Sequence, residues 1–371
     1  MPARTPAPNP SVDEAPASAS IGSLPRRRWL LRATSFAAAL GTDALASEPE
    51  HAAPAPNADC SVAVATLRGG QLVDPRETDR CHTPSGSTAV FQAASLGKPI
   101  VATLALKLAL RGKLDLEQPL SEVFPDGYGH RQNLFALRVA PVVDLVPGDI
   151  LKKLTARKLL SHTSGLPNWS NNAPLRPSFE PGTRWRYSGE GYVLLQHILE
   201  KLTGLPLNAL ATADLFEPLG MHDSALKLTE RVASALIAGR SASGQIRQLR
   251  FPYEIAASSL YTTATDYARF MAYTLGDQRL LSLITESPVS VPDVPGVYWG
   301  LGWAIEESSE HRSIWHWGNN PGFRALAMAD LTSKHAVVVL AATESGMSRA
   351  KEVIRRVLPG PHPGLDLNLA R

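Results

Sequence analysis

The segments that read as β-strands lie in two widely separated parts of the chain, and this separation constrains the fold more than any other feature. Apolar runs typical of strands occur at residues 61–67 and 71–74, and then again at 299–305, 313–317, 323–329 and 335–341. Helical patterns and loops fill the interval between them. The late strands follow one another through short turns, which favours antiparallel pairing. We therefore predict an α+β fold (an α/β sandwich) in which one antiparallel sheet, built from N- and C-terminal segments, is flanked by helices and interrupted by a central all-α insertion.

The chain divides by composition into four parts. We predict an export signal at residues 1–46, a linker at 47–57, a domain at 58–358 and a tail at 359–371. Within the domain, the α/β part covers about 58–112 and 255–358, and the helical part about 113–254. The terminal helix is expected at 349–358, with Ser348 as its N-cap.

The first 46 residues resemble an export signal of the twin-arginine type. Arginines 26–28 precede a weakly apolar stretch that begins at Trp29 and is interrupted by Arg32 and Asp43. These two charges exclude a membrane-spanning helix here. We expect an exported protein, periplasmic or secreted; a disordered basic tail is the alternative.

The charge balance gives no reason to expect a nucleic-acid partner, because the net charge is only +3 over 371 residues. The ten histidines include no His-Glu-x-x-His motif, so a zinc hydrolase is not expected. Nothing calls for a metal or another cofactor. The expected partner is a small-molecule or peptide substrate.

The two cysteines flank the early hairpin. If Gly70 and Gln71 form a two-residue turn, the strand register places Cys60 opposite Cys81. A disulfide is then one possibility, consistent with an oxidising compartment, and two buried thiols are the other.

The best candidate for chemistry is Ser95. Lys98 follows one helical turn later, and Pro99, which is tolerated only in the first turn of a helix, requires a helix over about 95–110 to begin close to Ser95. A hydroxyl at the positive end of a helix, beside an amine that becomes a base when desolvated, is suited to nucleophilic catalysis. The spacing also occurs at Ser224–Lys227 and Ser348–Lys351, but only Ser95 has a β-like run before it and an uninterrupted helix after it.

Two further elements could complete a site. Tyr187 lies in a glycine-rich turn just before a helical segment, where its hydroxyl could face a cleft. His316, Trp317 and Gly318 end a β-run and meet Asn319, where backbone N–H groups could stabilise an oxyanion. Taken singly, each has a simpler interpretation: Tyr187 as an aromatic side chain packed in the core, and His316 as a strand histidine whose ring nitrogens are hydrogen-bonded.

Together with Ser95, these elements resemble the serine β-lactamase and penicillin-binding-protein family, on the side of class C β-lactamases, related esterases and D-amino-acid peptidases. The resemblance extends to three further segments, at 159–166, 179–183 and 256–264. It implies a β-lactamase/transpeptidase-like fold and an acyl-enzyme. It also implies roles for individual residues: Ser95 as nucleophile, Lys98 as its activator, Tyr187 as general acid/base, and the N–H groups of Ser95 and Asn319 as oxyanion donors, with His316 and Gly318 on the strand motif.

Two positions depart from the family pattern. Gly189 stands where the family usually has an asparagine that orients the lysine and a substrate carbonyl. His316 stands where the family usually has a lysine that supplies a fixed positive charge, whereas a histidine is mostly neutral at pH 7. A histidine strand motif resembles the esterase and peptidase side of the family more than a true class C-like β-lactamase.

Two other interpretations remain open from the sequence. Residues 93–97, Ala-Ala-Ser-Leu-Gly, resemble the nucleophile elbow of an α/β-hydrolase, which would require a parallel sheet. The second interpretation is a family member that has lost turnover and serves as a binding or cell-wall-associated protein. Gly189 is the best support for it.

Overall fold

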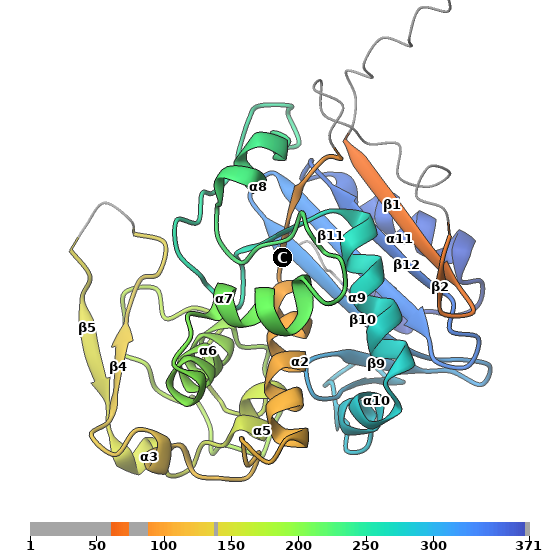
Figure 1. Cartoon of the computed structure of the whole chain (residues 1–371). Helices are drawn as coiled ribbons and strands as arrows, with labels where there is room; N and C mark the ends of the chain where they lie inside the picture. Colours follow the sequence, from red (N-terminus) through yellow and green to blue (C-terminus); the bar gives the residue numbers. More distant parts are fainter. Residues whose placement is uncertain (1–60, 74–87, 137–139, 368–371) are drawn as a thin grey trace, which may run out of the picture. The chain divides into compact units, whose positions relative to one another are not determined.

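The protein's fold is built on one eight-stranded antiparallel sheet. The structure, a computed structural model, describes residues 61–73, 88–136 and 140–367. The strand order is β2-β1-β12-β11-β10-β9-β8-β7. These strands are β1 (Val62–Arg68), β2 (Gln71–Leu72), β7 (Val289–Ser290), β8 (Val297–Trp299), β9 (Ala304–Glu307), β10 (Arg312–Asn320), β11 (Phe323–Asp330) and β12 (Ala336–Ala341). The predicted joining of early and late strands is confirmed, because β1 pairs with β12 (Figure 1).

Every strand pair of the described sheets is antiparallel. This excludes the α/β-hydrolase interpretation, which needs a parallel sheet. The Ser95 segment therefore belongs to a different architecture.

Helices cover both faces of the sheet, as the alternation of its side chains requires. On one face, Leu326 and Val337 pack in a cluster with Val353 of α11 (Gly346–Val357). On the other face, Ala327 and Val338 join the main core with the helices α2 (Gly97–Leu110) and α9 (Ala264–Gly276). Figure 1 shows α9 and α11 on opposite sides of the sheet.

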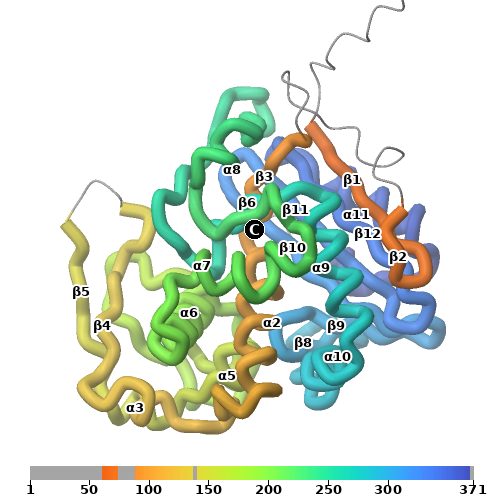
Figure 2. Tube along the Cα trace, viewed as in Figure 1, coloured from red at the N-terminus to blue at the C-terminus, as the bar shows by residue number. Residues whose placement is uncertain are grey.

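The remaining elements lie mostly between β2 and β7 in the sequence. They are β3 (Phe91–Ala94), α3 (Leu120–Val123), β4 (Tyr128–Arg131), β5 (Val143–Val146), α4 (Gly148–Leu151), α5 (Ala156–Leu160), α6 (Gly189–Thr203), α7 (Leu207–Ala211), η1 (Thr212–Phe216), α8 (Glu230–Ala235), β6 (Leu260–Thr262), α10 (Gln278–Thr285) and, near the C-terminus, η2 (Pro363–Asp366). Their course can be followed in Figure 2. Helical patterns in the sequence at 156–160, 191–202 and 208–211 predict helices there, and they correspond to α5, α6 and α7. The hairpin of β4 and β5 was not predicted, because strands of four residues give little periodic signal.

The early hairpin has a different register from the one predicted. Its turn is Gly69–Gly70, and Arg68 pairs with Gln71. Both glycines have positive φ, 56° and 80°, as a tight turn of mirror-image type requires. The prediction that Gly70 and Gln71 form the turn is wrong, so the register argument for pairing Cys60 with Cys81 fails. Both cysteines, and the predicted export signal, lie outside the described residues.

Two element boundaries also differ from the predictions. The strand predicted at 299–305 is divided into β8 and β9, because the chain turns at Gly300 and Gly302; a Cβ at Gly300 would lie 2.0 Å from the carbonyl oxygen of Ile284. Helix α11 begins at Gly346, so Ser348 lies inside it and is not its N-cap. Within the described residues, no helix combines the length and the apolar character that crossing a bilayer requires.

Candidate active site

A strained strand-to-helix turn positions Ser95. Strand β3 ends at Ala94, whose φ of 50° lies in the left-handed region that non-glycine residues rarely adopt. Helix α2 then begins at Gly97, with Pro99 in its first turn as predicted. Such strain persists only where the surrounding structure enforces it, and it is often found at functional sites.

Ser95 and Lys98 are in direct contact. Lys98 Nζ lies 2.9 Å from Ser95 Oγ and 2.9 Å from the carbonyl oxygen of Ala257, to which Ser95 Oγ also donates at 3.1 Å. The Lys98 side chain is fully buried, and burial lowers the pKa of its amine well below the usual value. A neutral amine at hydrogen-bond distance from a hydroxyl can accept its proton.

The other two Ser-x-x-Lys segments do not form such a pair. Ser224 Oγ contacts Thr262 and donates to Asp266, while Lys227 forms an ion pair with Glu254. Lys351 Nζ donates to the carbonyl oxygen of Leu367. Of the three, only Ser95 has its lysine as a partner.

Tyr187 lies over Lys98, as its place before α6 allows. Lys98 Nζ is 4.7 Å from the centre of the Tyr187 ring. The phenol hydroxyl is buried and has no well-formed hydrogen bond to a described residue. Burial raises the pKa of Tyr187 well above its usual value and outweighs the nearby Ser95 hydroxyl, which lowers it. Tyr187 is therefore a neutral phenol, able to donate a proton.

His316 is buried beside this group. Its Nδ1 contacts the backbone carbonyl oxygen of Trp317 at 2.8 Å, so Nδ1 carries the proton of the neutral ring. Nε2 is then an acceptor, and it is buried without a partner among the described residues. Burial, assisted by Lys98, lowers the pKa of His316 to about 3. This side chain therefore supplies an acceptor and no positive charge at neutral pH.

Gly318 allows strand β10 to approach the nucleophile. A Cβ at this position would lie 2.1 Å from the carbonyl oxygen of Ala93, two residues before Ser95. Asn319 follows, pairs with Arg324 in the sheet and lines the same pocket as Ser95. The two backbone segments predicted to supply oxyanion donors therefore meet at one pocket.

Gly189 is the first residue of α6, and its N–H donates to Oδ1 of Asn168 at 3.0 Å. A Cβ at Gly189 would lie 2.6 Å from the carbonyl oxygen of Asn168 and 3.0 Å from its Oδ1. The space beside Gly189 is thus filled by Asn168 and its neighbour Trp169.

The pocket above Ser95 has a volume of about 650 Å³ and carries no charged residue on its described walls. Its lining residues are Ser95, Phe135, Asn168, Trp169, Trp185, Tyr187, Leu249, Ser258, Val291, Pro292, Val294, Trp317, Asn319, Asn320, Pro321 and Leu367. Five of them are aromatic. Among the described residues, no cluster of three or more His, Cys, Asp or Glu side chains is placed to hold a metal ion.

Two residues of this region, His162 and Asn168, were not predicted from the sequence. His162 is fully buried, with its ring centre 4.4 Å from that of Tyr187, and it accepts a hydrogen bond at Nδ1 from the N–H of Ser188. Burial, then Lys98 and His316, lower its pKa well below the usual value. The only available signal was their position in or beside the segment 159–166, which contributed to the family resemblance.

A sequence model of the family described as Beta-lactamase matches residues 59–359. Penicillin-binding protein 4* of Bacillus subtilis is 23% identical over 318 residues, covering 73% of this chain and 65% of its own length. Esterase EstB of Burkholderia gladioli is 31% identical over 185 residues, which are 42% of each chain. The match therefore spans less than two thirds of each of these relatives.

Among solved structures, a D-stereospecific amidohydrolase from Streptomyces sp. superimposes with a TM-score of 0.61. It is 20% identical, and the match covers 83% of this chain and 95% of the amidohydrolase. At this identity the likeness concerns the fold, and it agrees with the predicted antiparallel sheet flanked by helices.

Proposed function

Because the chain belongs to the beta-lactamase family, we propose that it is a serine hydrolase that cleaves an ester or amide through an acyl-enzyme. One observation carries the proposal: Ser95 Oγ and Lys98 Nζ lie 2.9 Å apart at a pocket wall, and the amine is fully buried. Desolvation lowers the pKa of such an amine, so that its unprotonated form is available to accept a proton.

In the proposed reaction, Lys98 takes the proton of Ser95 as Oγ forms a bond to the substrate carbonyl carbon. The electron pair of the carbonyl moves to its oxygen, which the N–H groups of Ser95 and Asn319 stabilise. Collapse of this intermediate breaks the bond to the leaving group, which receives the proton from Lys98 through the Tyr187 hydroxyl. Water then attacks the acyl-enzyme, and the same groups return the proton to Ser95.

His316 has a secondary part in this proposal. Its unprotonated Nε2 is buried near Tyr187, with the ring centres 6.2 Å apart. We assign it the role of an acceptor that orients the Tyr187 hydroxyl during proton transfer.

The pocket favours uncharged substrates with an apolar acyl group. Aromatic and aliphatic side chains dominate its walls, and the pKa of His316, at about 3, leaves this side chain uncharged at neutral pH. Burying a substrate carboxylate against such walls is costly. A true class C-like β-lactamase, whose substrates carry a carboxylate, is therefore the second candidate, and the esterase and amidohydrolase relatives support the first.

A binding or cell-wall-associated role without turnover is the remaining alternative. Gly189 supported it, because the family's usual asparagine is absent there. A binding module, however, has no need of a desolvated lysine against a serine.

The test uses the full chain and three probes: a short-chain p-nitrophenyl ester, a D-aminoacyl amide and a penicillin. Intact-protein mass and product release are followed together. Ser95→Ala is expected to abolish both adduct and turnover, with an unchanged unfolding temperature. Ser348→Ala, an exposed serine in the same Ser-x-x-Lys spacing, is the matched control and should behave as the parent protein. Turnover that survives Ser95→Ala would overturn the proposal, and no adduct or turnover with any probe would favour the binding role.

We also propose that the protein is exported, because arginines 26–28 precede an apolar stretch rich in alanine. Expression in a bacterial host with and without residues 1–46, followed by cell fractionation, tests this. An intracellular, unprocessed full-length chain would contradict it.

A further inference from the structure

The last described segment of the chain returns to the pocket that contains Ser95. After α11, residues 360–367, which include η2, form a segment that we call the strap. Its last residue, Leu367, lines that pocket with a half-buried side chain. The family model matches the chain only as far as residue 359, so the strap lies beyond the matched segment. The wall that the strap supplies is therefore a feature that the family match does not describe.

A buried carboxylate anchors the first half of the strap. Both ring nitrogens of His362 face oxygen acceptors: Nδ1 contacts Glu306 of β9, and Nε2 contacts the carbonyl oxygen of Leu358 at 2.7 Å. Burial lowers the pKa of His362, but these hydrogen bonds outweigh it and raise the pKa overall. Glu306 also accepts the N–H of Gly364 at 3.1 Å. A buried carboxylate with two such partners holds both in place.

A lysine of α11 anchors the end of the strap. Lys351 Nζ donates to the carbonyl oxygen of Leu367 at 2.9 Å. Leu365 is fully buried in the same cluster as Val353 of α11, and Leu367 packs against that cluster. Leu367 is thus held through its backbone as well as through its side chain. A side chain supported in this way forms a fixed part of the pocket wall.

A row of aromatic rings connects the strap to Tyr187. Gly364 lies against Trp315, because a Cβ at position 364 would be 2.3 Å from Cζ2 of that ring. The ring centres of Trp315 and Trp317 are 5.7 Å apart, and those of Trp317 and Tyr187 are 5.1 Å apart. Trp317 and Tyr187 line the pocket together with Leu367. The strap therefore meets the pocket beside a row of rings that ends at a group of the proposed mechanism.

The wall around Leu367 is apolar. Val291 and Val294 belong to or pack against the same cluster as Leu367, and both also line the pocket. Each methylene group of an acyl chain that is buried against such side chains contributes favourably until the chain reaches Leu367. A further methylene then meets a side chain that its anchors hold in place, and overpacking of this kind is unfavourable.

We propose that Leu367 is a specificity-determining residue that limits the length of the acyl group accepted by the Ser95 pocket. This rests on the proposed acyl-enzyme function and makes it more specific. The substrates are then esters or amides whose apolar acyl group ends against the strap.

The test measures kcat/KM for p-nitrophenyl esters whose straight acyl chains lengthen from acetyl to dodecanoyl. In the parent protein, kcat/KM should rise with chain length and then fall once the chain reaches Leu367. Leu367→Ala should move the maximum to chains about two methylene groups longer, and Leu367→Trp should move it to shorter chains. At the first length beyond the parent maximum, Leu367→Ala should exceed the parent protein about 10-fold.

Two further variants accompany these. Lys351→Met removes the donor to the Leu367 carbonyl oxygen and keeps a side chain of similar length, so the maximum should also move to longer chains, by less than in Leu367→Ala. Leu205→Ala makes the same chemical change as Leu367→Ala at an exposed leucine that does not line the pocket. It should leave the maximum at the parent length.

Thermal unfolding is measured for each variant, and Lys351→Met provides the test if the Leu367 variants do not fold. The assignment of Leu367 would be overturned by a parent profile without a maximum. It would also be overturned if the maximum of folded Leu367→Ala stayed at the parent length or moved to shorter chains. Either result leaves the acyl-enzyme intact, whereas hydrolysis of these esters by Ser95→Ala at the parent rate would show that the proposed function itself is wrong.

Discussion

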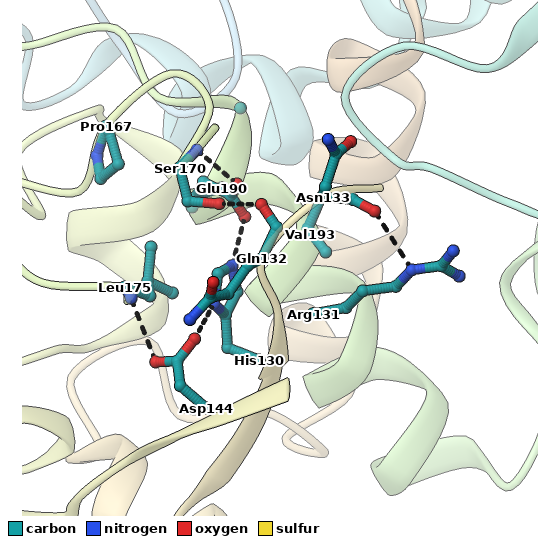
Figure 3. Close-up of polar contacts among 12 residues, drawn as sticks. His130, Arg131, Gln132, Asn133, Asp144, Pro167, Ser170, Leu175, Glu190 and Val193 are labelled. Atoms are coloured by element: carbon teal, nitrogen blue, oxygen red, sulfur yellow. Dashed lines mark hydrogen bonds and ion pairs between the residues drawn. The ribbon is translucent and has the colours of Figure 1, made fainter. Parts of the chain in front are cut away.

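Two buried polar clusters lie on either side of the start of α6, and they differ in how completely their polar atoms are paired. In the first, around Ser95, buried polar atoms of Tyr187, His162 and His316 make no well-formed hydrogen bond within the described part of the chain. In the second, His130 Nδ1 contacts Asp144 at 2.8 Å and its Nε2 contacts Glu190 at 3.2 Å (Figure 3).

The second cluster contains ionisable side chains whose polar atoms all have hydrogen-bond partners. Burial alone lowers the pKa of His130, but hydrogen bonds to Glu190 and Asp144 outweigh it and raise the pKa overall. The second oxygen of each carboxylate accepts a backbone N–H, from Ser170 and from Leu175. A fully paired network of this kind stabilises one arrangement of the loops that it joins.

Burial of polar groups therefore does not by itself indicate catalysis. The His130 cluster fastens the hairpin of β4 and β5 to the loop that carries Asn168. In the proposed function, the donors and acceptors of the Ser95 cluster serve the substrate. Substitutions in the first cluster should therefore lower stability, and substitutions in the second should lower activity.

Lys98→Met should produce the largest effect. It removes the proposed base, so kcat/KM is expected to fall about 10³-fold. Stability should hold or rise, because an apolar side chain of similar length replaces a buried amine. Steady-state kinetics and thermal unfolding of the same preparation check both. A strongly destabilised variant with normal activity would mean that Lys98 acts as a structural residue.

Glu190→Gln should produce the largest loss of stability. It leaves His130 with one carboxylate, and the free energy of unfolding is expected to fall by about 3 kcal/mol. Urea unfolding measures the change. Glu180→Gln is the control, because Glu180 forms an ion pair of 2.9 Å with Lys153 in which both side chains are more than half exposed. It should cost less than about 1 kcal/mol. Equal losses at the two positions would remove the distinction between the clusters.

His316→Phe should have a smaller effect on activity. It removes the proposed acceptor for the Tyr187 hydroxyl, so kcat is expected to fall about 10-fold. His335→Phe, at an exposed histidine, should leave kcat unchanged. A pH–rate profile and kcat identical to those of the parent protein would show that His316 has no part in the reaction.

The pH dependence of stability should give the smallest effect. The pKa of His130 is raised in the folded state. Its contribution to the free energy of unfolding is therefore complete below the unfolded-state pKa of about 6.5, and it is lost as the pH rises through the folded-state pKa. The pKa of Asp144 is lowered in the folded state, because hydrogen bonds, above all the one from His130, outweigh the effect of burial, which raises it. Its contribution to the free energy of unfolding is therefore lost only as the pH falls below the unfolded-state pKa of about 3.9.

The destabilisation caused by Glu190→Gln should therefore be greater at about pH 5.5 than at about pH 9, by about 1 kcal/mol. Urea unfolding at the two pH values measures it. The opposite order would mean that His130 is neutral in the folded protein.

Much of the fold follows from local sequence. The apolar runs of β10, β11 and β12 and the helical periods of α5 and α6 are properties of short segments, so they could be predicted. The turns were harder to predict than the strands and helices, because their geometry depends on contacts with other parts of the chain. Gly300 separates β8 from β9 where a side chain would meet the backbone of Ile284, a residue in a different element.

The sequence by itself determined the pairing of Ser95 with Lys98, since a helix that begins near Pro99 places residues three apart on one face. Through the family resemblance, it also predicted that Tyr187, Gly189 and His316 belong to the same site. Only the tertiary structure decided that Lys98 is completely desolvated, that His316 is an acceptor with a pKa of about 3, and that Asn168 fills the space beside Gly189. Burial and contact between distant segments are created by packing, and no local pattern records them.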